Sequence, residues 1–194
     1  MDEKGKATEL NEQGSVTSRD GRSLAVRRLT RADGPALQRF NAGLSPESRR
    51  LFLPHRYDDE TVRKSLGRSA DGEDLALGLW DGERLVGYFF LWYFRRRVPL
   101  LGIGLADEYQ GRGLGRPLMD ILIREAERNG NEGIELTTMQ DNERAFALYR
   151  KAGFRYLRDV ENVAGDGRIA IERAMFHEIK PGAAPMQEPH RPPV

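Results

Sequence analysis

The sequence predicts a single α/β (α+β) domain, with a mixed, mostly antiparallel central sheet of six to seven strands and helices on both faces. Two observations predict this fold. Before residue 106, apolar alternation indicates four strands, two of them joined by Asp81-Gly82, a common hairpin turn. After residue 106 the pattern changes to helix, strand and helix, which places helices on both sides of the sheet.

Periodicity and turn signals place each element. Strands are expected over residues 23–29, 75–80, 84–94, 98–106, 133–139, 154–160 and 168–176. Helices are expected after Asp33, after Ser45 with Pro46 at the first helical position, and over residues 59–66, 113–128 and 142–151. Asn142 and Gly153 supply the cap and the end of the last helix.

Composition and charge restrict the class of protein. Of the 194 residues, 39% are hydrophobic and 31% are charged, as expected for one soluble globular domain. The net charge of +1 gives no electrostatic argument for a nucleic acid or a membrane, so neither is expected as a partner. The chain contains no cysteine, which excludes a disulfide framework, a thiolate nucleophile and a cysteine zinc site. No metal is expected.

The two ends of the chain differ in composition from its middle. Residues 1–20 are expected to be disordered, residues 21–180 to form the domain, and residues 181–194 to be a flexible, proline-rich tail. The N-terminus lacks the apolar core of a signal peptide, and no stretch reaches the roughly 18 to 20 apolar residues of a membrane span. A cytoplasmic monomer or homodimer is therefore expected.

A glycine-rich segment joins the strand over residues 98–106 to the next helix. Glycine occupies alternate positions, at Gly111, Gly113 and Gly115. Glycine tolerates positive φ and has no Cβ, so such a turn can point successive N–H groups at one anion beside the helix N-terminus. Arg112 and Arg116 can add positive charge. The segment suits a phosphate or pyrophosphate, with a tight strand-to-helix turn as the simpler alternative.

Two other phosphate-binding loops do not fit this spacing. A P-loop requires Lys followed by Ser or Thr after the last glycine, whereas Arg116-Pro117 follows here. A dinucleotide-binding turn requires a third glycine three positions after the second, and that position, counted from Gly113, is Arg116. A nucleotide-binding protein of either class is therefore disfavoured.

Two blocks of the sequence resemble the GNAT N-acetyltransferase superfamily. Gln110, Gly113 and Gly115 match the coenzyme-loop pattern Gln/Arg-x-x-Gly-x-Gly/Ala. Residues 142–154 match the pattern Asn-x-x-Ala-x-x-x-Tyr-x-Lys-x-Gly-Phe at every fixed position. The blocks come in the family's order, and the resemblance extends over the elements of residues 23–176. The shorter stretch Leu44-Ser45-Pro46-Glu47-Ser48-Arg49 is similar to one in GNAT domains of bacterial protein-lysine acetyltransferases, and a plain helix start is its alternative.

The resemblance implies an acetyl-CoA-dependent N-acetyltransferase that acts on a primary amine of a small molecule or a protein lysine, by direct attack on the thioester. Tyr149 matches the family's general acid, which protonates the departing thiolate. The thioester carbonyl would meet a backbone N–H of the strand before the loop. The implied coenzyme-binding residues are Ile103, Gly104, Leu105, Gln110, Gly111, Arg112, Gly113, Leu114, Gly115, Arg116 and Asn142.

Several of these residues also have a purely structural explanation. Tyr149 lies on the apolar stripe of its helix, and its alternative is a core tyrosine whose hydroxyl reaches a backbone partner. Asn142 is a helix cap in any case. Gly102 and Gly104 indicate close approach of a ligand or backbone inside a strand, and a simple bulge is the alternative.

The general base stays unassigned. An amine with a pKa near 10 is mostly protonated at neutral pH, so some group must accept its proton. Many family members carry an acidic residue on the strand that reads Leu100-Leu101-Gly102-Ile103 here. Glu73, Asp74 and Glu135 can act through water, and nothing in the sequence selects one. A catalytically idle acyl-CoA sensor is therefore the alternative function, although the retained Tyr149 argues for an enzyme.

The acceptor is expected between the early helices and the strands that follow them. The aromatic strand over residues 88–93 is mostly core, and Tyr88, Phe90 or Trp92 are candidates to line the acceptor pocket. The run of arginines at residues 95–97 indicates a solvated turn. The three histidines show no ligand or triad spacing, so they receive no role.

Overall fold

One mixed sheet of eight strands forms the centre of the molecule. The structure is a computed structural model that describes residues 14–186 and 193–194. Its strands are β1 (Gly14–Thr17), β2 (Ser23–Arg28), β3 (Leu75–Asp81), β4 (Arg84–Trp92), β5 (Leu100–Leu105), β6 (Gly133–Met139), β7 (Arg155–Val163) and β8 (Ile169–Glu178). Its helices are α1 (Gly34–Ala42), α2 (Pro46–Leu51), α3 (Asp59–Ala70), α4 (Gly115–Asn129) and α5 (Glu143–Lys151), with 3-10 turns at η1 (Arg31–Asp33) and η2 (Asp107–Tyr109).

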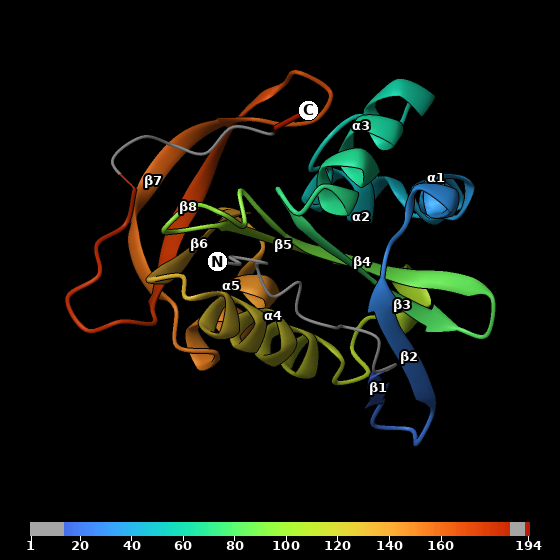
Figure 1. The fold of residues 1–194 in the computed structure, drawn as a ribbon, viewed down its shortest axis with the longest axis horizontal. Helices are drawn as coiled ribbons and strands as arrows, with labels where there is room; N and C mark the ends of the chain where they lie inside the picture. The colour runs from blue at the N-terminus through green and yellow to red at the C-terminus, as the bar shows by residue number, and fades with distance from the viewer. Residues whose placement is uncertain (1–13, 187–192) are drawn as a thin grey trace, which may run out of the picture.

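The strand order is β1-β2-β3-β4-β5-β6-β8-β7 (Figure 1). Neighbouring strands are antiparallel except β5 and β6, which are parallel. Figure 1 shows α1, α2 and α3 on one side of the sheet and α4 and α5 on the other. The predicted fold class is therefore confirmed.

The sheet has one strand more than the six to seven expected, and this strand is β1. It lies within the segment 1–20 that was expected to be disordered, and it pairs with β2. Only Val16 of its four residues is buried, so the sequence carries almost no apolar signal there. Residues 1–13 and, in the tail, residues 187–192 lie outside the described residues, and the predictions for them stay untested.

The centre of the core lies along β3 and β4, between the two helical layers. Every residue of β4 after Arg84 is buried, as expected for a central strand covered on both faces. Tyr88, Phe89 and Phe90 are among the largest side chains that are fully enclosed. The aromatic run is thus core along most of its length.

Two helices, α2 and α5, begin with the predicted side-chain caps, whereas α1 does not. The Ser45 side chain accepts the Ser48 N–H, with Pro46 at the first helical position, and the Asn142 side chain accepts the Ala145 N–H at 3.1 Å. The Asp33 carboxylate does not cap α1. It accepts the Thr30 N–H at 2.7 Å and pairs with Arg27 at 2.8 Å, and this pairing lowers the pKa of Asp33 to about 2.

The sheet separates between β5 and β6. These strands pair at one position only, Leu100 with Glu135, and the Glu135 N–H donates to the Pro99 carbonyl at 3.0 Å. Beyond that pair, β5 stays paired with β4 and β6 stays paired with β8. The gap therefore widens toward the C-terminal ends of β5 and β6, where the glycine segment begins.

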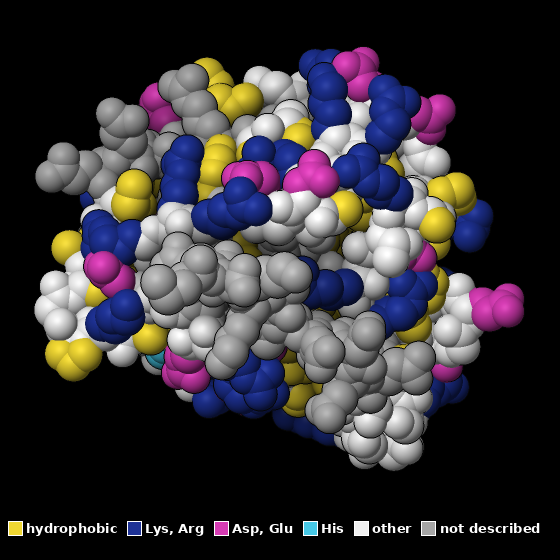
Figure 2. All heavy atoms as spheres, in the orientation of Figure 1, with side chains coloured by type: hydrophobic (Ala, Val, Ile, Leu, Met, Phe, Trp, Pro, Cys, Tyr) yellow, Lys and Arg dark blue, Asp and Glu magenta, His cyan; other side chains and the backbone are white. Residues whose placement is uncertain are grey.

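Charged side chains of both signs lie side by side on the face seen in Figure 2. The predicted arginine turn follows this pattern. Arg95 pairs with Glu73 at 2.5 Å, Arg97 pairs with Glu132 at 2.9 Å, and Arg96 lies over the Tyr93 ring. Over the described ranges, the structure holds no helix long and apolar enough to cross a membrane.

Candidate active site

The free edge of β5 presents backbone donors to the gap. Along an antiparallel strand, N–H groups point alternately to the two sides. The Ala106 N–H donates to the Val86 carbonyl at 2.9 Å, so Gly104 also points toward β4 and the N–H groups of Ile103 and Leu105 face the gap. Three residues were predicted to offer an N–H to the thioester carbonyl. The N–H groups of Ile103 and Leu105 point into the gap, whereas that of Gly104 points toward β4.

The glycine segment has the backbone conformation that its sequence predicted. Gly111 and Gly113 have φ of 76° and 80°, and α4 begins at Gly115. The Gln110 side chain fixes the start of the segment, because its amide donates to the Ser48 hydroxyl at 2.9 Å and to the Leu105 carbonyl at 3.1 Å. Gln110 thus holds the loop against α2 and β5 through its side chain.

The carboxylate of Asp107 joins the same network. It accepts the Ser45 N–H at 2.9 Å and the hydroxyls of Ser45 and Ser48 at 2.7 Å and 2.6 Å. These hydrogen bonds lower the pKa of Asp107, the one from Ser48 contributing most. The short segment around Pro46 is therefore both a capped helix start and the anchor of the strand-to-helix turn.

Two arginines that the sequence patterns did not single out lie against the glycine segment. Arg19 crosses Gly113 so closely that a Cβ there would lie 2.8 Å from its Cγ and 2.9 Å from its Nε. The Arg144 guanidinium, on α5, lies 3.7 Å from the place a Cβ of Gly111 would take. Neither arginine has a carboxylate partner among the residues the structure describes. Both are therefore positioned to meet an anion on the loop.

Arg112 and Arg116, the two arginines inside the glycine segment, already form ion pairs and hydrogen bonds within the protein. Arg112 pairs with Asp20 and donates to the Glu108 carbonyl at 2.5 Å. Arg116 donates to Asp120 at 2.8 Å and to the Lys151 carbonyl at 2.6 Å, which ties α4 to the end of α5. Their predicted contribution to coenzyme binding stays a prediction, and each has a structural role in addition.

Three of the glycines are required by packing within the protein. A Cβ at Gly115 would lie 2.7 Å from Leu148, at the contact of α4 with α5. A Cβ at Gly102 would lie 2.2 Å from the Phe90 ring, and one at Gly104 would lie 2.3 Å from the Phe52 ring. The groups that closely approach Gly102 and Gly104 are aromatic side chains, whereas the sequence predicted a ligand or another backbone there.

Tyr149 lies on α5 with its side chain almost wholly buried, at 7% exposure, and its ring centroid is 6.2 Å from that of Phe154. Its hydroxyl makes no hydrogen bond to any residue that the structure describes. A purely structural core tyrosine was expected to hydrogen-bond a backbone group, and that hydrogen bond is not found among these residues. Burial raises the pKa of Tyr149, and the nearby negative charge of Glu172 raises it further. The phenol is therefore protonated at neutral pH.

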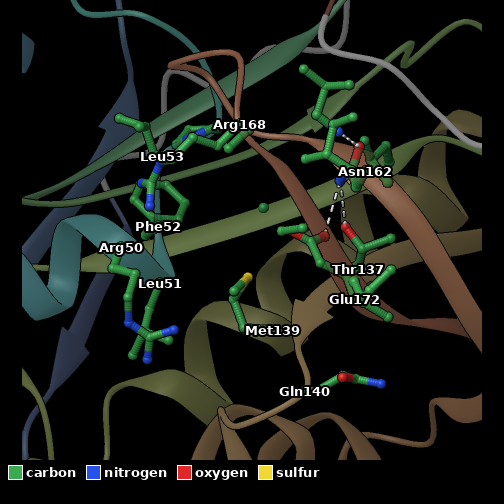
Figure 3. Close-up of a pocket in the computed structure, with 18 of the residues that line it drawn as sticks. Arg50, Leu51, Phe52, Leu53, Thr137, Met139, Gln140, Asn162, Arg168 and Glu172 are labelled. Carbon is green, nitrogen blue, oxygen red and sulfur yellow. Dashed lines mark hydrogen bonds between the residues drawn. The ribbon is translucent and has the colours of Figure 1, made fainter.

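A pocket of about 600 Å³ opens where β5 and β6 begin to separate. In Figure 3, Arg50, Leu51, Phe52 and Leu53 lie on one side of it and Thr137, Asn162 and Glu172 on the other. Of the three aromatic residues considered for an acceptor pocket, Phe90 and Trp92 form part of its wall, whereas Tyr88 does not. Residues 110–116 are not among the lining residues, so this pocket is a separate part of the site from the glycine loop.

The turn between β7 and β8 lies close to the segment that follows α2. The Gly165 N–H donates to the Leu53 carbonyl at 2.9 Å, and a Cβ at Gly165 would lie 2.5 Å from the His55 backbone. Leu53, Ala164 and Arg168 all line the pocket. This contact joins two walls of the pocket that are more than one hundred residues apart in the sequence.

None of the three carboxylates considered for the base lines the pocket. Glu73 pairs with Arg95 at 2.5 Å on the surface. Asp74 is buried, pairs with Arg68 at 2.7 Å and accepts the Tyr93 N–H at 2.8 Å. Glu135 accepts the Met186 N–H at 2.5 Å. Across residues 14–186 and 193–194, no group of three or more acidic or histidine side chains could hold a metal ion.

Comparison with known proteins agrees with this architecture. The model of the acetyltransferase (GNAT) family matches residues 40–154, which is more than half of the chain. The chain is 33% identical to the N-alpha-acetyltransferase RimI of Mycobacterium tuberculosis over 140 residues, which cover 70% of this chain and 80% of that protein. The chain therefore belongs to the GNAT acetyltransferase family.

Other relatives match over a shorter stretch or by fold alone. Over 81 residues the chain is 41% identical to the mycothiol acetyltransferase of Corynebacterium efficiens, covering 40% of this chain and 27% of that protein. The matched region thus spans about a quarter of that relative. The spermidine N-acetyltransferase of Vibrio cholerae, solved with CoA and spermine, superposes with a TM-score of 0.65 at 20% identity, covering 80% of this chain and 95% of that one. The family predicted from the two sequence blocks is confirmed.

Proposed function

We propose that the protein is an acetyl-CoA-dependent N-acetyltransferase that transfers the acetyl group directly to a primary amine. One observation carries the proposal: the sheet opens between β5 and β6, with backbone donors on one edge of the gap and the pocket at its beginning. A linear thioester fits such a gap, because its carbonyl can accept an N–H of Ile103 or Leu105 without disturbing the β4–β5 ladder.

The residues at the other end of the gap suit the phosphates of the coenzyme. Two glycines with positive φ lead into the N-terminus of a fifteen-residue helix, where backbone N–H groups and the helix dipole favour an anion. Arg19 and Arg144 add charge that no carboxylate of the described residues neutralises. We propose that Gly111–Gly115 holds the pyrophosphate and that these arginines contact the phosphate groups.

The Tyr149 phenol is proposed as the general acid. Acetyl transfer breaks the C–S bond, and the departing thiolate needs a proton. Burial raises the pKa of Tyr149, so the group is protonated when it is needed. The lack of a hydrogen-bond partner within the described residues leaves the hydroxyl free to donate. Acetyl-CoA supplies the activated acyl group, and the chain supplies position and the proton.

The acceptor is proposed to be a primary amine of a small molecule or of a protein, and a protein lysine is one such group. The names of the relatives include both kinds: RimI is an N-alpha-acetyltransferase, and the Vibrio cholerae enzyme acetylates spermidine. The pocket of about 600 Å³ with apolar and charged walls can hold either the end of a chain or a small molecule.

A catalytically idle acyl-CoA sensor is the competing function, and a panel of amines separates the two. The purified protein is incubated with acetyl-CoA and with polyamines, amino sugars, lysine peptides and peptides with free N-termini, while free thiol is measured. The proposal expects amine-dependent thiol release in step with acetylated product. A thermal shift with acetyl-CoA but no thiol release on any amine would favour the sensor.

A further inference from the structure

Four charged side chains line the pocket, and they differ in how they are paired. Arg50 pairs with Asp141 at 2.8 Å, and Arg168 pairs with Asp166 at 2.6 Å. Glu172, on β8, has no cationic partner among the residues that the structure describes. The pocket therefore contains one carboxylate whose charge is balanced by no neighbouring cation.

Glu172 is held in place by neutral groups. The Asn162 amide donates to its Oε2 at 2.9 Å and to the Thr137 hydroxyl at 3.3 Å (Figure 3). This arrangement spans β6, β7 and β8, so the carboxylate is held in the wall of the pocket, one strand beyond the gap. Glu172 is half-buried, which keeps it open to the pocket while restricting its movement.

We infer that Glu172 is the general base of the proposed acetyl transfer, accepting a proton from the ammonium form of the acceptor within the pocket. The inference rests on the proposed function and assigns the one step that the sequence left open. The balancing charge that Glu172 lacks is supplied by the cationic acceptor. The negative charge of Glu172 contributes, after burial, to raising the pKa of Tyr149.

The acceptor nitrogen loses two protons on going from ammonium to amide. Glu172 accepts the first and passes it to solvent, and the neutral amine then forms the C–N bond as the C–S bond breaks. Tyr149 gives its phenolic proton to the thiolate, and the second nitrogen proton restores the phenol. The net products are the amide, free coenzyme thiol and one proton.

The charged groups around Glu172 determine how the loss of kcat/KM in a Glu172 variant depends on pH. They are Tyr149 on α5, Glu135 on β6, the Arg50–Asp141 pair and Arg168 at the hairpin turn. Burial raises the pKa of the Tyr149 phenol above its usual value. The acceptor amine, with an ordinary pKa of about 10, loses its proton over the range tested.

The test is the pH profile of kcat/KM in Glu172→Gln, with Glu161→Gln as the matched control. Glu161 is exposed on β7 and does not line the pocket. At pH 7, Glu172→Gln is expected to lose about 10²-fold in kcat/KM, since general-base catalysis is typically worth that much. The loss should shrink to within about threefold as the pH nears the pKa of the amine, about 10. Glu172→Asp should recover part of the rate.

Two results would overturn the inference. One is a Glu172→Gln rate equal to that of the wild type at pH 7. The other is a loss of the same size at every pH, in a variant with unchanged thermal unfolding and acetyl-CoA affinity, because that indicates a positioning role. Both leave the proposed function intact. Absence of turnover in the wild type on every amine would instead contradict the proposed function itself.

Discussion

The two ends of the site are built in different ways. The proposed coenzyme end is a continuous stretch of chain, residues 107–115, anchored by Asp107 and Gln110 to the start of α2. The proposed acceptor pocket is assembled from α2, three strands of the sheet and the β7–β8 hairpin, segments that are far apart in the sequence. A local motif can be recognised in one sequence, whereas a pocket made of distant segments needs the fold. The same contrast predicts that substitutions at the two ends will separate coenzyme binding from acceptor chemistry.

The largest separation is expected for Tyr149→Phe. Loss of the phenolic proton should lower kcat by about 10²- to 10⁴-fold. The affinity for acetyl-CoA should stay within about twofold, because the substitution removes only a hydroxyl that makes no hydrogen bond to any residue that the structure describes. Steady-state kinetics and isothermal titration on the same preparation measure both quantities. Unchanged turnover would remove Tyr149 from the mechanism.

The pH profile of the wild type adds a test of the same acid. A donor must be protonated, and burial raises the pKa of Tyr149 above its usual value near 10. Activity should therefore rise with pH as the acceptor amine loses its proton, with no descending limb below about pH 10. A limb that falls near pH 8 and disappears in Tyr149→Phe would contradict the raised pKa.

Gly113→Glu should break the coenzyme end. A side chain at φ of 80° costs about 1–2 kcal/mol, and it would meet Arg19 while bringing a negative charge to the phosphate loop. We expect acetyl-CoA to bind at least about 30-fold more weakly. Gly130→Glu is the matched control, since it lies at the other end of α4 with φ of 83° and open space around it. Equal affinities in the two variants would show that the loop is not the coenzyme site.

Gly165→Ala should act on the acceptor end alone. Its Cβ would lie 2.5 Å from the His55 backbone, so the β7–β8 turn must move away from the segment after α2. We expect kcat/KM for the acceptor to fall about tenfold, with acetyl-CoA affinity unchanged. Gly14→Ala, at a position with open space and no positive φ, serves as the control. A loss of coenzyme affinity in Gly165→Ala would show that the two ends are not separable.

The smallest effects are expected for Arg19→Ala and Arg144→Ala. Each removes one exposed charge beside the glycine loop, so acetyl-CoA should bind about five- to tenfold more weakly in each variant. The difference from the wild type should diminish at high salt, and the acceptor KM should not change. Titrations at two salt concentrations provide the measurement. Binding equal to the wild type at low salt would exclude both residues from the phosphate contacts.

The sequence predicted the fold and the backbone conformation of the glycine segment because their signals are local. Glycines at 111 and 113, the caps at Ser45 and Asn142, and the apolar runs of β3 and β4 each leave a short pattern. The sequence missed β1 because that strand buries one side chain. It missed Arg19, Arg144 and Glu172 because strand pairing and helix packing, which connect distant residues, bring them to the site. It suggested Glu73 and Asp74 as candidate bases, but both form ion pairs outside the pocket.

The most direct test of the account is a crystal structure of the protein with coenzyme A bound. The account predicts the pyrophosphate on the N–H groups of Gly111–Gly115, the arm between β5 and β6, and the sulfur near the Tyr149 hydroxyl. It also predicts Glu172 across the pocket, facing the position of the acceptor. Coenzyme bound outside the β5–β6 gap, or a Tyr149 hydroxyl pointing away from the sulfur, would contradict it.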